Sequence, residues 1–171
     1  MNNGVAVAAD GSVYAVGYEN SSNGGGVNYE ALVAKFTTDG ALSWQKKLYG
    51  SMNDQFSRIA IGADGGVYVV GFENSSTGGN YEALVAKFTS DGALTWQKKL
   101  GGSGNECFYG ASVCGVDNNL YLCGGESSTV SRAAAIIVSI SPDADGTSGT
   151  IPSIPALSWG NPGLSLTAES F

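Results

Sequence analysis

The 171-residue sequence contains no histidine, and charged residues make up only 13% of it. Histidine is the commonest general base and a frequent zinc ligand, so its absence disfavours the usual acid–base and metal chemistry. No serine or cysteine stands in a nucleophile motif. We therefore expect a protein that is not an enzyme and that needs no metal and no cofactor.

Cysteine is also scarce. The three cysteines, Cys107, Cys114 and Cys123, lie in the last third of the chain, and their spacing matches no zinc or redox motif. Cys114 and Cys123 stand where Ile61 and Val70 stand about fifty residues earlier. Because a buried free cysteine behaves as a small hydrophobic residue, we expect the cysteines to fill the core.

Positive charge and long apolar runs are missing as well. The net charge is −7, and a nucleic-acid backbone requires clustered Lys and Arg, so nucleic-acid binding is not expected. The longest purely apolar run, 133–138, is far too short to cross a bilayer, and no signal-peptide pattern precedes the first strand. We expect no membrane segment, and either a chain outside the usual secretory route or a piece of a longer protein.

Glycine is abundant, with 26 residues, and hydrophobic residues make up 43% of the chain. This composition favours many short strands joined by tight turns, and so predicts an all-β fold. The chain also repeats itself: segment 28–48 recurs almost letter for letter as 80–100. Such repetition is typical of proteins built from stacked units.

Each repeat begins with two β-rich runs around a turn: Asp10-Gly11, Asp64-Gly65 and Asp117-Asn118-Asn119. These turn residues tolerate the positive φ of tight hairpins. The third strands are expected at 31–36, 83–88 and 135–140, and the fourth at 42–48, 94–100 and from 157 to 159 onward. The paired lysines of the fourth strands, at 46–47 and 98–99, predict a solvated outer strand that resists edge pairing.

Four strands in about 52–54 residues, repeated three times, are typical of β-propeller blades. We expect one domain, 1–171, with four-stranded antiparallel blades at 4–50, 51–102 and 103–162. The third blade contains an insertion, 141–155, and 163–171 would begin a further strand or form a tail. A three-sheet β-prism is the alternative fold.

The motifs Asp-Gly-x-Val-Tyr-x-Val-Gly, Ala-Leu-Val-Ala-Lys-Phe-Thr-x-Asp-Gly and Leu-x-Trp-Gln-Lys-Lys-Leu resemble a bacterial β-propeller repeat family. Its members include virion structural proteins of tailed phages and bacterial surface proteins. The third repeat departs from it, because Ser139 replaces Lys35 and Lys87 and the Gln-Lys-Lys is missing. The resemblance implies a virion structural protein, associated with the tail or capsid. The alternatives are an adhesin at the bacterial surface or secreted, and a fragment of a larger surface protein.

Propellers usually carry four to eight blades, so three would leave two blade faces uncovered. We expect those faces to be covered by a second copy of the chain, most simply in a six-bladed ring, or by neighbouring virion or surface proteins. Lys35 and Lys87 lie inside apolar strands, so each requires a partner, and we expect an acid on a neighbouring blade. The repeated tryptophans are expected to pack between blades.

The connections between second and third strands, and between successive blades, are long and polar, and binding residues concentrate in such loops. Amide, carboxylate and aromatic groups together suit glycans, although the same residues would also satisfy loop backbone groups. The candidate ligand-binding residues are Glu19, Asn20, Asn28, Tyr29, Glu30, Asp54, Glu73, Asn74, Asn80, Tyr81, Glu82 and Glu106.

Overall fold

The computed structural model describes residues 2–21, 28–50, 52–74, 79–102, 104–127, 133–140, 149–150, 158–160 and 165–168. This part of the chain is composed of strands, turns and short connections. It contains no helix of the length and apolar character needed to cross a membrane. The all-β prediction is confirmed.

Each of the three repeats supplies consecutive strands. The first repeat contains β1 Asn2–Val7, β2 Val13–Ser21, β3 Asn28–Phe36 and β4 Leu42–Tyr49. The second contains β5 Gln55–Ile61, β6 Val67–Asn74, β7 Tyr81–Phe88 and β8 Leu94–Gly101. The third contains β9 Asn105–Val113, β10 Leu120–Ser127, β11 Ala133–Ile140 and β12 Gly149–Thr150, and β13 Ser158–Gly160 and β14 Ser165–Ala168 follow.

These strands form three antiparallel sheets in which β1 to β4, β5 to β8 and β9 to β12 each follow one another in sequence order, and β13 and β14 join the edges of two of the sheets. Sheet 1 has the order β1-β2-β3-β4-β14, sheet 2 the order β13-β8-β7-β6-β5, and sheet 3 the order β12-β11-β10-β9. Short turns join the first two strands of every sheet. Gly11, Gly65 and Asn118 in these turns all have positive φ, which confirms the hairpins predicted from the Asp-Gly and Asp-Asn-Asn sequences.

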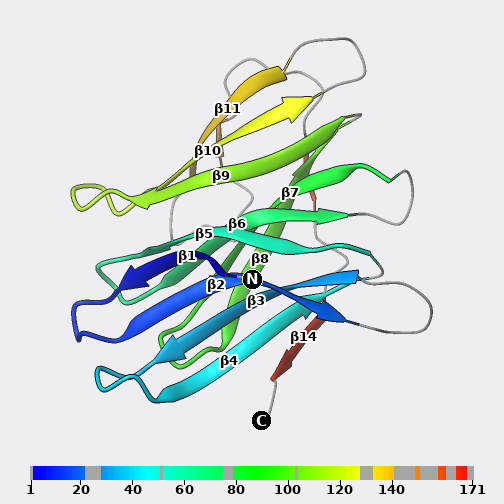
Figure 1. Ribbon diagram of the computed structural model, residues 1–171. Coiled ribbons are helices and arrows are strands. Elements are labelled where there is room, and N and C mark those ends of the chain that lie inside the picture. The colour runs from blue at the N-terminus through cyan, green and yellow to red at the C-terminus, as the bar shows by residue number, and fades with distance from the viewer. Residues whose placement is uncertain are drawn as a thin grey trace.

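The sheets are stacked, with sheet 2 between sheets 1 and 3 (Figure 1). One core joins sheets 1 and 2 and is made largely of buried Tyr14, Val16, Val33, Leu48, Phe56, Val69, Leu84 and Phe88. A second core joins sheets 2 and 3 and contains Tyr68, Val70, Val85, Leu100, Phe108, Leu120, Leu122 and Ile140. Sheet 2 therefore buries both of its faces, which explains why its strands are almost continuously apolar.

The first strands of successive sheets contact one another, β1 with β5 and β5 with β9. The sheets thus lie close together along their first strands and diverge toward their outer strands, as the ribbon shows (Figure 1). Because the strands alternate in direction, the β2–β3 and β6–β7 connections lie at the same end as the starts of β1, β5 and β9. We call this end of the molecule the connection end.

The outer edges differ from the prediction. Residues 157–159 were expected to be the fourth strand of the third repeat, but β13 pairs with β8 of sheet 2, with Trp159 opposite Leu100. β14 pairs with β4, with Thr167 opposite Lys47. The lysines were expected to prevent such edge pairing, and this prediction is wrong. Because side chains alternate across a strand, lysines leave its backbone N–H and C=O groups open to a partner.

The hairpins at the connection end are longer than expected. The connections between second and third strands were predicted to be long loops, which in the first repeat meant segment 18–30. Instead β2 continues to Ser21 and β3 begins at Asn28, with Glu19 opposite Glu30 and Asn20 opposite Tyr29. The β6–β7 hairpin repeats this pairing, with Glu73 opposite Glu82. The polar composition was misleading because, in each hairpin, a lysine ion pair and a pair of aromatic rings in tilted contact stabilise the extended strands.

The two lysines inside apolar strands do have partners. Lys87 Nζ lies 3.2 Å from Asp64 Oδ2, but Asp64 belongs to the same sheet and not to a neighbouring one. Lys35 Nζ reaches the next sheet and donates a hydrogen bond of 3.2 Å to the backbone carbonyl of Ser90. The expectation of an acid on a neighbouring blade is therefore wrong for Lys87. Lys35 does reach the neighbouring sheet, where it bonds a carbonyl and acts electrostatically on Asp91. Each ammonium also lies over a tyrosine ring, about 5 Å from its centroid.

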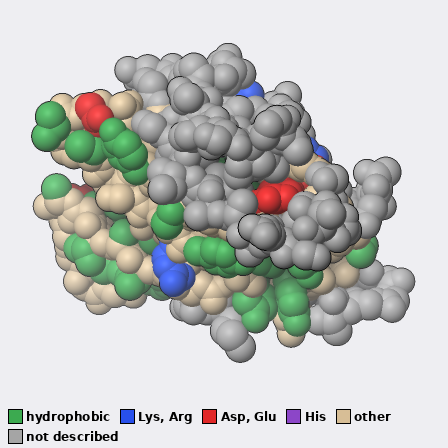
Figure 2. Space-filling view, turned by 90° about the horizontal axis from the view of Figure 1, so that it is seen from above, with side chains coloured by type: hydrophobic (Ala, Val, Ile, Leu, Met, Phe, Trp, Pro, Cys, Tyr) green, Lys and Arg blue, Asp and Glu red, His purple; other side chains and the backbone are tan. Residues whose placement is uncertain are grey.

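The cysteines do not all fill the core. Cys107 is buried and Cys114 is half-buried, whereas Cys123 is exposed, so the prediction is wrong for that residue. Cys123 occupies the position of the fully buried Val70, but no further sheet of the described residues covers the outer face of sheet 3. A view from above shows hydrophobic side chains at the described surface and few charged ones (Figure 2).

Candidate functional site

A cavity of about 670 Å³ opens at the connection end, between sheets 2 and 3 and beside the start of β1. Its size is typical of small-molecule sites. The shared inner strands β1, β5 and β9 provide most of the wall, and β6, β7 and β10 provide the rest. The lining residues are Asn3, Gln55, Ser57, Arg58, Phe72, Tyr81, Asn105, Glu106, Cys107, Tyr109, Gly125 and Glu126.

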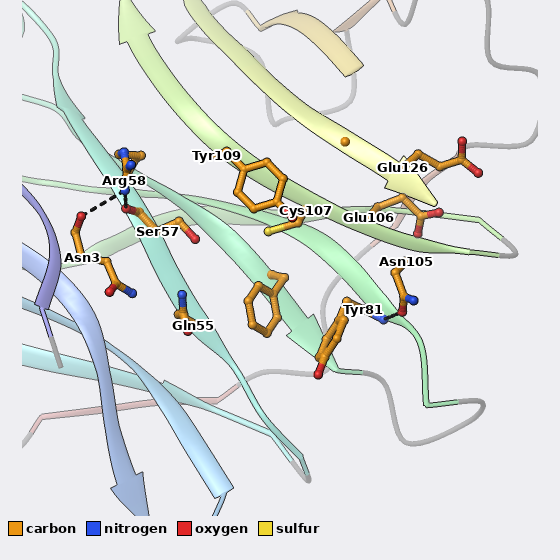
Figure 3. A pocket seen from close by; sticks show the side chains of 12 residues that line it. Asn3, Gln55, Ser57, Arg58, Tyr81, Asn105, Glu106, Cys107, Tyr109 and Glu126 are labelled. Carbon is orange, nitrogen blue, oxygen red and sulfur yellow. Dashed lines mark hydrogen bonds between the residues drawn. The ribbon is translucent and has the colours of Figure 1, made fainter. Parts of the chain in front are cut away.

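One end of the cavity is basic. Arg58 Nη1 donates hydrogen bonds to the backbone carbonyls of Asn3, at 3.0 Å, and Ser57, at 2.7 Å. The Asn3 side chain in turn donates to the carbonyl of Phe56, at 3.1 Å. These contacts fix the guanidinium at the junction of β1 and β5, where Figure 3 shows it on the opposite side of the cavity from Glu106 and Glu126.

Aromatic rings occupy the middle of the cavity. Phe72 and Tyr81 lie on adjacent strands of sheet 2, with their ring centroids 4.6 Å apart. Tyr109 approaches from β9, and 61% of this residue is exposed (Figure 3). Cys107 lies beside Tyr109, and burial raises the pKa of its thiol to about 11. The thiol is therefore protonated at neutral pH and is not an activated nucleophile.

The other end of the cavity is acidic and buried. Glu106 is fully buried; its Oε2 accepts a hydrogen bond of 3.2 Å from the Gly102 N–H, while its Oε1 has no hydrogen-bond partner among the described residues. Burial raises the pKa of Glu106, the Gly102 N–H opposes that effect, and the neighbouring Glu126 adds to it. Glu126 lies opposite Glu106 in the β9–β10 pairing, so both side chains are on the same face of sheet 3.

Asp54 holds the equivalent position to Glu106 in the second repeat, and its role is structural. Its carboxylate accepts hydrogen bonds from the backbone N–H groups of Gly50, at 2.7 Å, and Asn74, at 3.3 Å. Its own N–H donates to the carbonyl of Tyr29, at 2.8 Å. Asp54 therefore ties the link between sheets 1 and 2 to both sheets. Burial raises the pKa of this carboxyl to about 7.

Two lysine–glutamate groups repeat at the connection end. In sheet 1, Lys47 Nζ lies 2.8 Å from both Glu19 Oε1 and Glu30 Oε2. In sheet 2, Lys99 Nζ lies 3.1 Å from Glu73 Oε1 and also contacts Glu82. Burial raises the pKa of Glu73, and Lys99 acts in the opposite direction. Each lysine lies between two glutamates, of which Glu30 in sheet 1 and Glu73 in sheet 2 are buried, and offsets the repulsion between them.

The structure separates the twelve sequence-predicted residues into groups. Tyr81 and Glu106 line the cavity. Glu19, Glu30, Glu73 and Glu82 belong to the lysine groups, and Asp54 binds backbone N–H groups. Tyr29 packs against Tyr18, with the rings tilted by 49° and their centroids 4.6 Å apart, and Asn20 is exposed. Asn28, Asn74 and Asn80 are half-buried near the hairpin ends. The predicted set is therefore not one site.

Sequence reasoning missed Asn3, Arg58, Cys107, Tyr109 and Glu126 as neighbours in one cavity. Most of them lie in β1, β5 and β9, the first strands of the repeats. The periodicity of the sequence does not indicate that these three strands contact one another. One signal was available for Glu126. It aligns with Glu73, and segment 133–171, which follows it, contains no lysine or arginine.

The described residues contain no group of three or more His, Cys, Asp or Glu side chains that would hold a metal ion. No known protein family matches the sequence, and neither does any curated protein. Two features of the chain itself therefore bear on its function: the exposed outer faces of sheets 1 and 3, and the cavity.

Proposed function

We propose that this protein is a non-enzymatic assembly module, a β-propeller in which a second copy of the chain supplies the missing blades. The observation that carries the proposal is a comparison of equivalent residues in the repeats. The outer face of sheet 1 is the repeat equivalent of the face that sheet 2 packs on sheet 1. The outer face of sheet 3 is the equivalent of the face that sheet 2 packs on sheet 3. They are therefore expected to pack on each other when they belong to different copies.

The outer face of sheet 1 is apolar and open. Val5 is 68% exposed, whereas its repeat equivalent in sheet 2, Ile59, is 8% exposed. Val7 is likewise exposed, and its equivalent, Ile61, packs against the core between sheets 1 and 2. The outer face of sheet 1 therefore carries the side chains that, in sheet 2, pack on Tyr14, Val16 and Leu48.

The outer face of sheet 3 shows the complementary pattern. Tyr121 is 41% exposed, whereas its equivalents Tyr14 and Tyr68 are buried. Cys123 is exposed where Val70 is fully buried. The outer face of sheet 3 thus corresponds to the face of sheet 1 that packs on sheet 2, and to the face of sheet 2 that packs on sheet 3. The sheet 3 face of one copy is expected to receive the sheet 1 face of another, which is a heterologous contact that closes a ring or extends a filament.

The size of these faces supports a stable contact. Four strands side by side, six to nine residues long in sheet 1, give a face of roughly 500 Å². Two contacts in a two-copy ring would bury roughly 2,000 Å² in total, which lies in the range of specific protein–protein interfaces. The burial of both faces of sheet 2 favours stacked blades over a β-prism, in which each sheet buries only its inner face.

The resemblance of the repeat to propeller modules in tailed-phage virions supports a location in a virion tail or capsid. A bacterial surface protein is the alternative. Nearly identical repeats present nearly identical docking surfaces, which suits a rigid structural part. The near identity of segments 28–48 and 80–100 supports this interpretation, because an enzyme or receptor site normally needs differentiated residues.

The assembly proposal is tested with Val5→Lys/Val7→Lys, examined by size-exclusion chromatography with light scattering. Both side chains are exposed in the single chain, so the substitution leaves the fold intact but places two charges in the contact. The wild-type protein is expected to elute as a dimer or larger assembly, and the double variant as a monomer. Val116→Lys is the matched control, because Val116 is an exposed turn residue away from both faces. Equal masses for the double variant and the wild type would contradict the proposal.

A second candidate is glycan recognition at the connection end, favoured by the exposed tyrosines of the cavity. A glycan array read with wild type, Tyr81→Ala and Tyr29→Ala tests it. Tyr81 lines the cavity and Tyr29 does not. Selective binding that is lost in Tyr81→Ala and retained in Tyr29→Ala is expected if the cavity is a glycan site, and equal loss in both variants would contradict it.

A further inference from the structure

The two lysine–glutamate groups show what the connection end normally holds. On sheet 2, the buried carboxylate of Glu73 is neutralised by Lys99. On sheet 1, Glu19 is neutralised in the same way by Lys47. In both sheets an ammonium group occupies the space between a glutamate of the second strand and a glutamate of the third. The first two repeats therefore show that an ammonium group is bound beside the second-strand glutamate.

Sheet 3 retains the glutamate, but no lysine of its described residues stands beside it. Glu126 stands at the Glu73 position, but its β11 neighbour is Ala134 instead of a glutamate. β12 is formed only by Gly149 and Thr150, and no lysine or arginine follows Arg132 in the sequence. Glu126 is nevertheless only 9% exposed, and no lysine or arginine within the described residues forms an ion pair with it. Within the described residues, this buried carboxylate therefore has no cation of the kind that its counterparts have.

Glu106 places a second acid next to it. Glu106 and Glu126 are directly opposite in the β9–β10 ladder, and both line the cavity. Glu106 is fully buried, and in the described part of the chain its Oε1 has no hydrogen-bond partner. The nearby Lys99 is already shared between Glu73 and Glu82. Two like charges at such a position are destabilising unless a cation lies between them or a proton is bound.

We propose that the cavity between sheets 2 and 3 binds an organic cation, whose primary ammonium group lies between Glu106 and Glu126. The ammonium supplies Glu126 with the positive charge that Lys47 and Lys99 supply to its repeat equivalents, Glu19 and Glu73. The remainder of the ligand packs on Phe72, Tyr81 and Tyr109, whose rings favour both apolar groups and cations. A volume of about 670 Å³ accommodates a small amine with room for a larger body.

The chemistry of the cavity distinguishes this ligand from a metal ion and from an anion. Two carboxylates without a third acidic, histidine or cysteine ligand do not form a metal centre among the described residues. The basic group, Arg58, is held by backbone carbonyls at the opposite end, so it does not neutralise the two acids. A ligand that also carries a negative group would direct that group to Arg58.

The test uses n-butylammonium chloride, because this ion is the lysine side chain without its backbone. Titration of the intact protein, followed by NMR chemical shifts, is expected to show saturable changes at Tyr81, Tyr109 and Glu126. 1-Butanol, which has the same shape without the charge, and sodium chloride at equal ionic strength are expected to produce at least tenfold weaker effects. Equal responses to the amine and the alcohol, or to the amine and sodium, would overturn the proposal.

Substitutions locate the bound cation. Glu126→Gln keeps the shape of the side chain and is expected to weaken n-butylammonium binding at least tenfold. Glu19→Gln is the matched control, because Glu19 is the repeat equivalent that already has Lys47, and it is expected to leave the affinity unchanged. An equal loss in both variants would contradict the assignment. Binding is also expected to persist in the Val5→Lys/Val7→Lys monomer, so this proposal and the assembly proposal succeed or fail independently.

Discussion

The indole Nε1 of Trp44 in sheet 1 donates a hydrogen bond of 3.2 Å to the backbone carbonyl of Ser90 in sheet 2. Two further donors converge on the same oxygen, Lys35 Nζ at 3.2 Å and the Tyr14 hydroxyl at 3.4 Å. Because Ser90 lies in the turn between β7 and β8, this single carbonyl fixes the outer part of sheet 2 on sheet 1. Apolar packing brings the two sheets together, and these directional bonds set their relative position.

Trp44→Phe is expected to lower the free energy of unfolding by about 1 kcal/mol, because it removes the hydrogen bond to Ser90 and keeps an aromatic ring in place. Trp96→Phe is the matched control, since Trp96 is the repeat equivalent and its Nε1 has no hydrogen-bond partner in the part of the chain that the structure describes. Urea denaturation measures both. A loss for Trp96→Phe equal to that for Trp44→Phe would show that the Ser90 contact does not stabilise the fold.

Asp54 predicts an unusual pH dependence of stability. Its pKa in the folded protein is about 7, raised chiefly by burial, whereas an unfolded aspartate titrates near 3.9. Between these values the folded state binds more protons, so its contribution to stability is complete below about pH 4 and is lost as the pH rises through 7. The free energy of unfolding is therefore expected to fall by up to about 1.4 kcal/mol per pH unit in this window.

Asp54→Asn is expected to flatten that slope, as measured by urea denaturation at pH values from about 4 to 8. Asp91→Asn serves as a control of opposite sign. The Thr89 hydroxyl lowers the pKa of Asp91, so its contribution to stability is lost as the pH falls. An unchanged slope in Asp54→Asn would mean that other groups, such as Glu73 and Glu106, cause the pH dependence.

Lys99→Met is expected to destabilise the protein by about 2 kcal/mol, because the buried Glu73 and its neighbour Glu82 would lose their shared cation. The effect is moderate because part of the Lys99 side chain remains exposed, where solvent weakens the ion pair. Lys46→Met is the control, since Lys46 forms no ion pair within the described residues and should change stability by less than about 0.5 kcal/mol. Thermal denaturation of both variants provides the measurement.

Local sequence signals predicted the strands and hairpins. They did not predict which strands far apart in the sequence pair or contact one another. Asp-Gly and Asp-Asn-Asn identified the hairpins because positive φ at Gly11, Gly65 and Asn118 is a local requirement. Segment 157–159 was assigned to the wrong sheet because strand pairing depends on which edge is free, and periodicity carries no such information. The candidate site was predicted poorly for a related reason: residues chosen by loop composition lie in strands, whereas the cavity arises where three first strands meet.

Cross-linking between position 5 on sheet 1 and Cys123 on sheet 3 tests the assembly most directly. Val5→Cys is made together with Cys114→Ser, treated with a short bismaleimide at low protein concentration, and mapped by mass spectrometry. An intermolecular link between positions 5 and 123 is expected. This link should be several-fold more abundant than the intermolecular link between positions 116 and 123 in a Val116→Cys/Cys114→Ser control. Equal yields in the two proteins, or a single chain that stays monomeric at every concentration, would contradict the account.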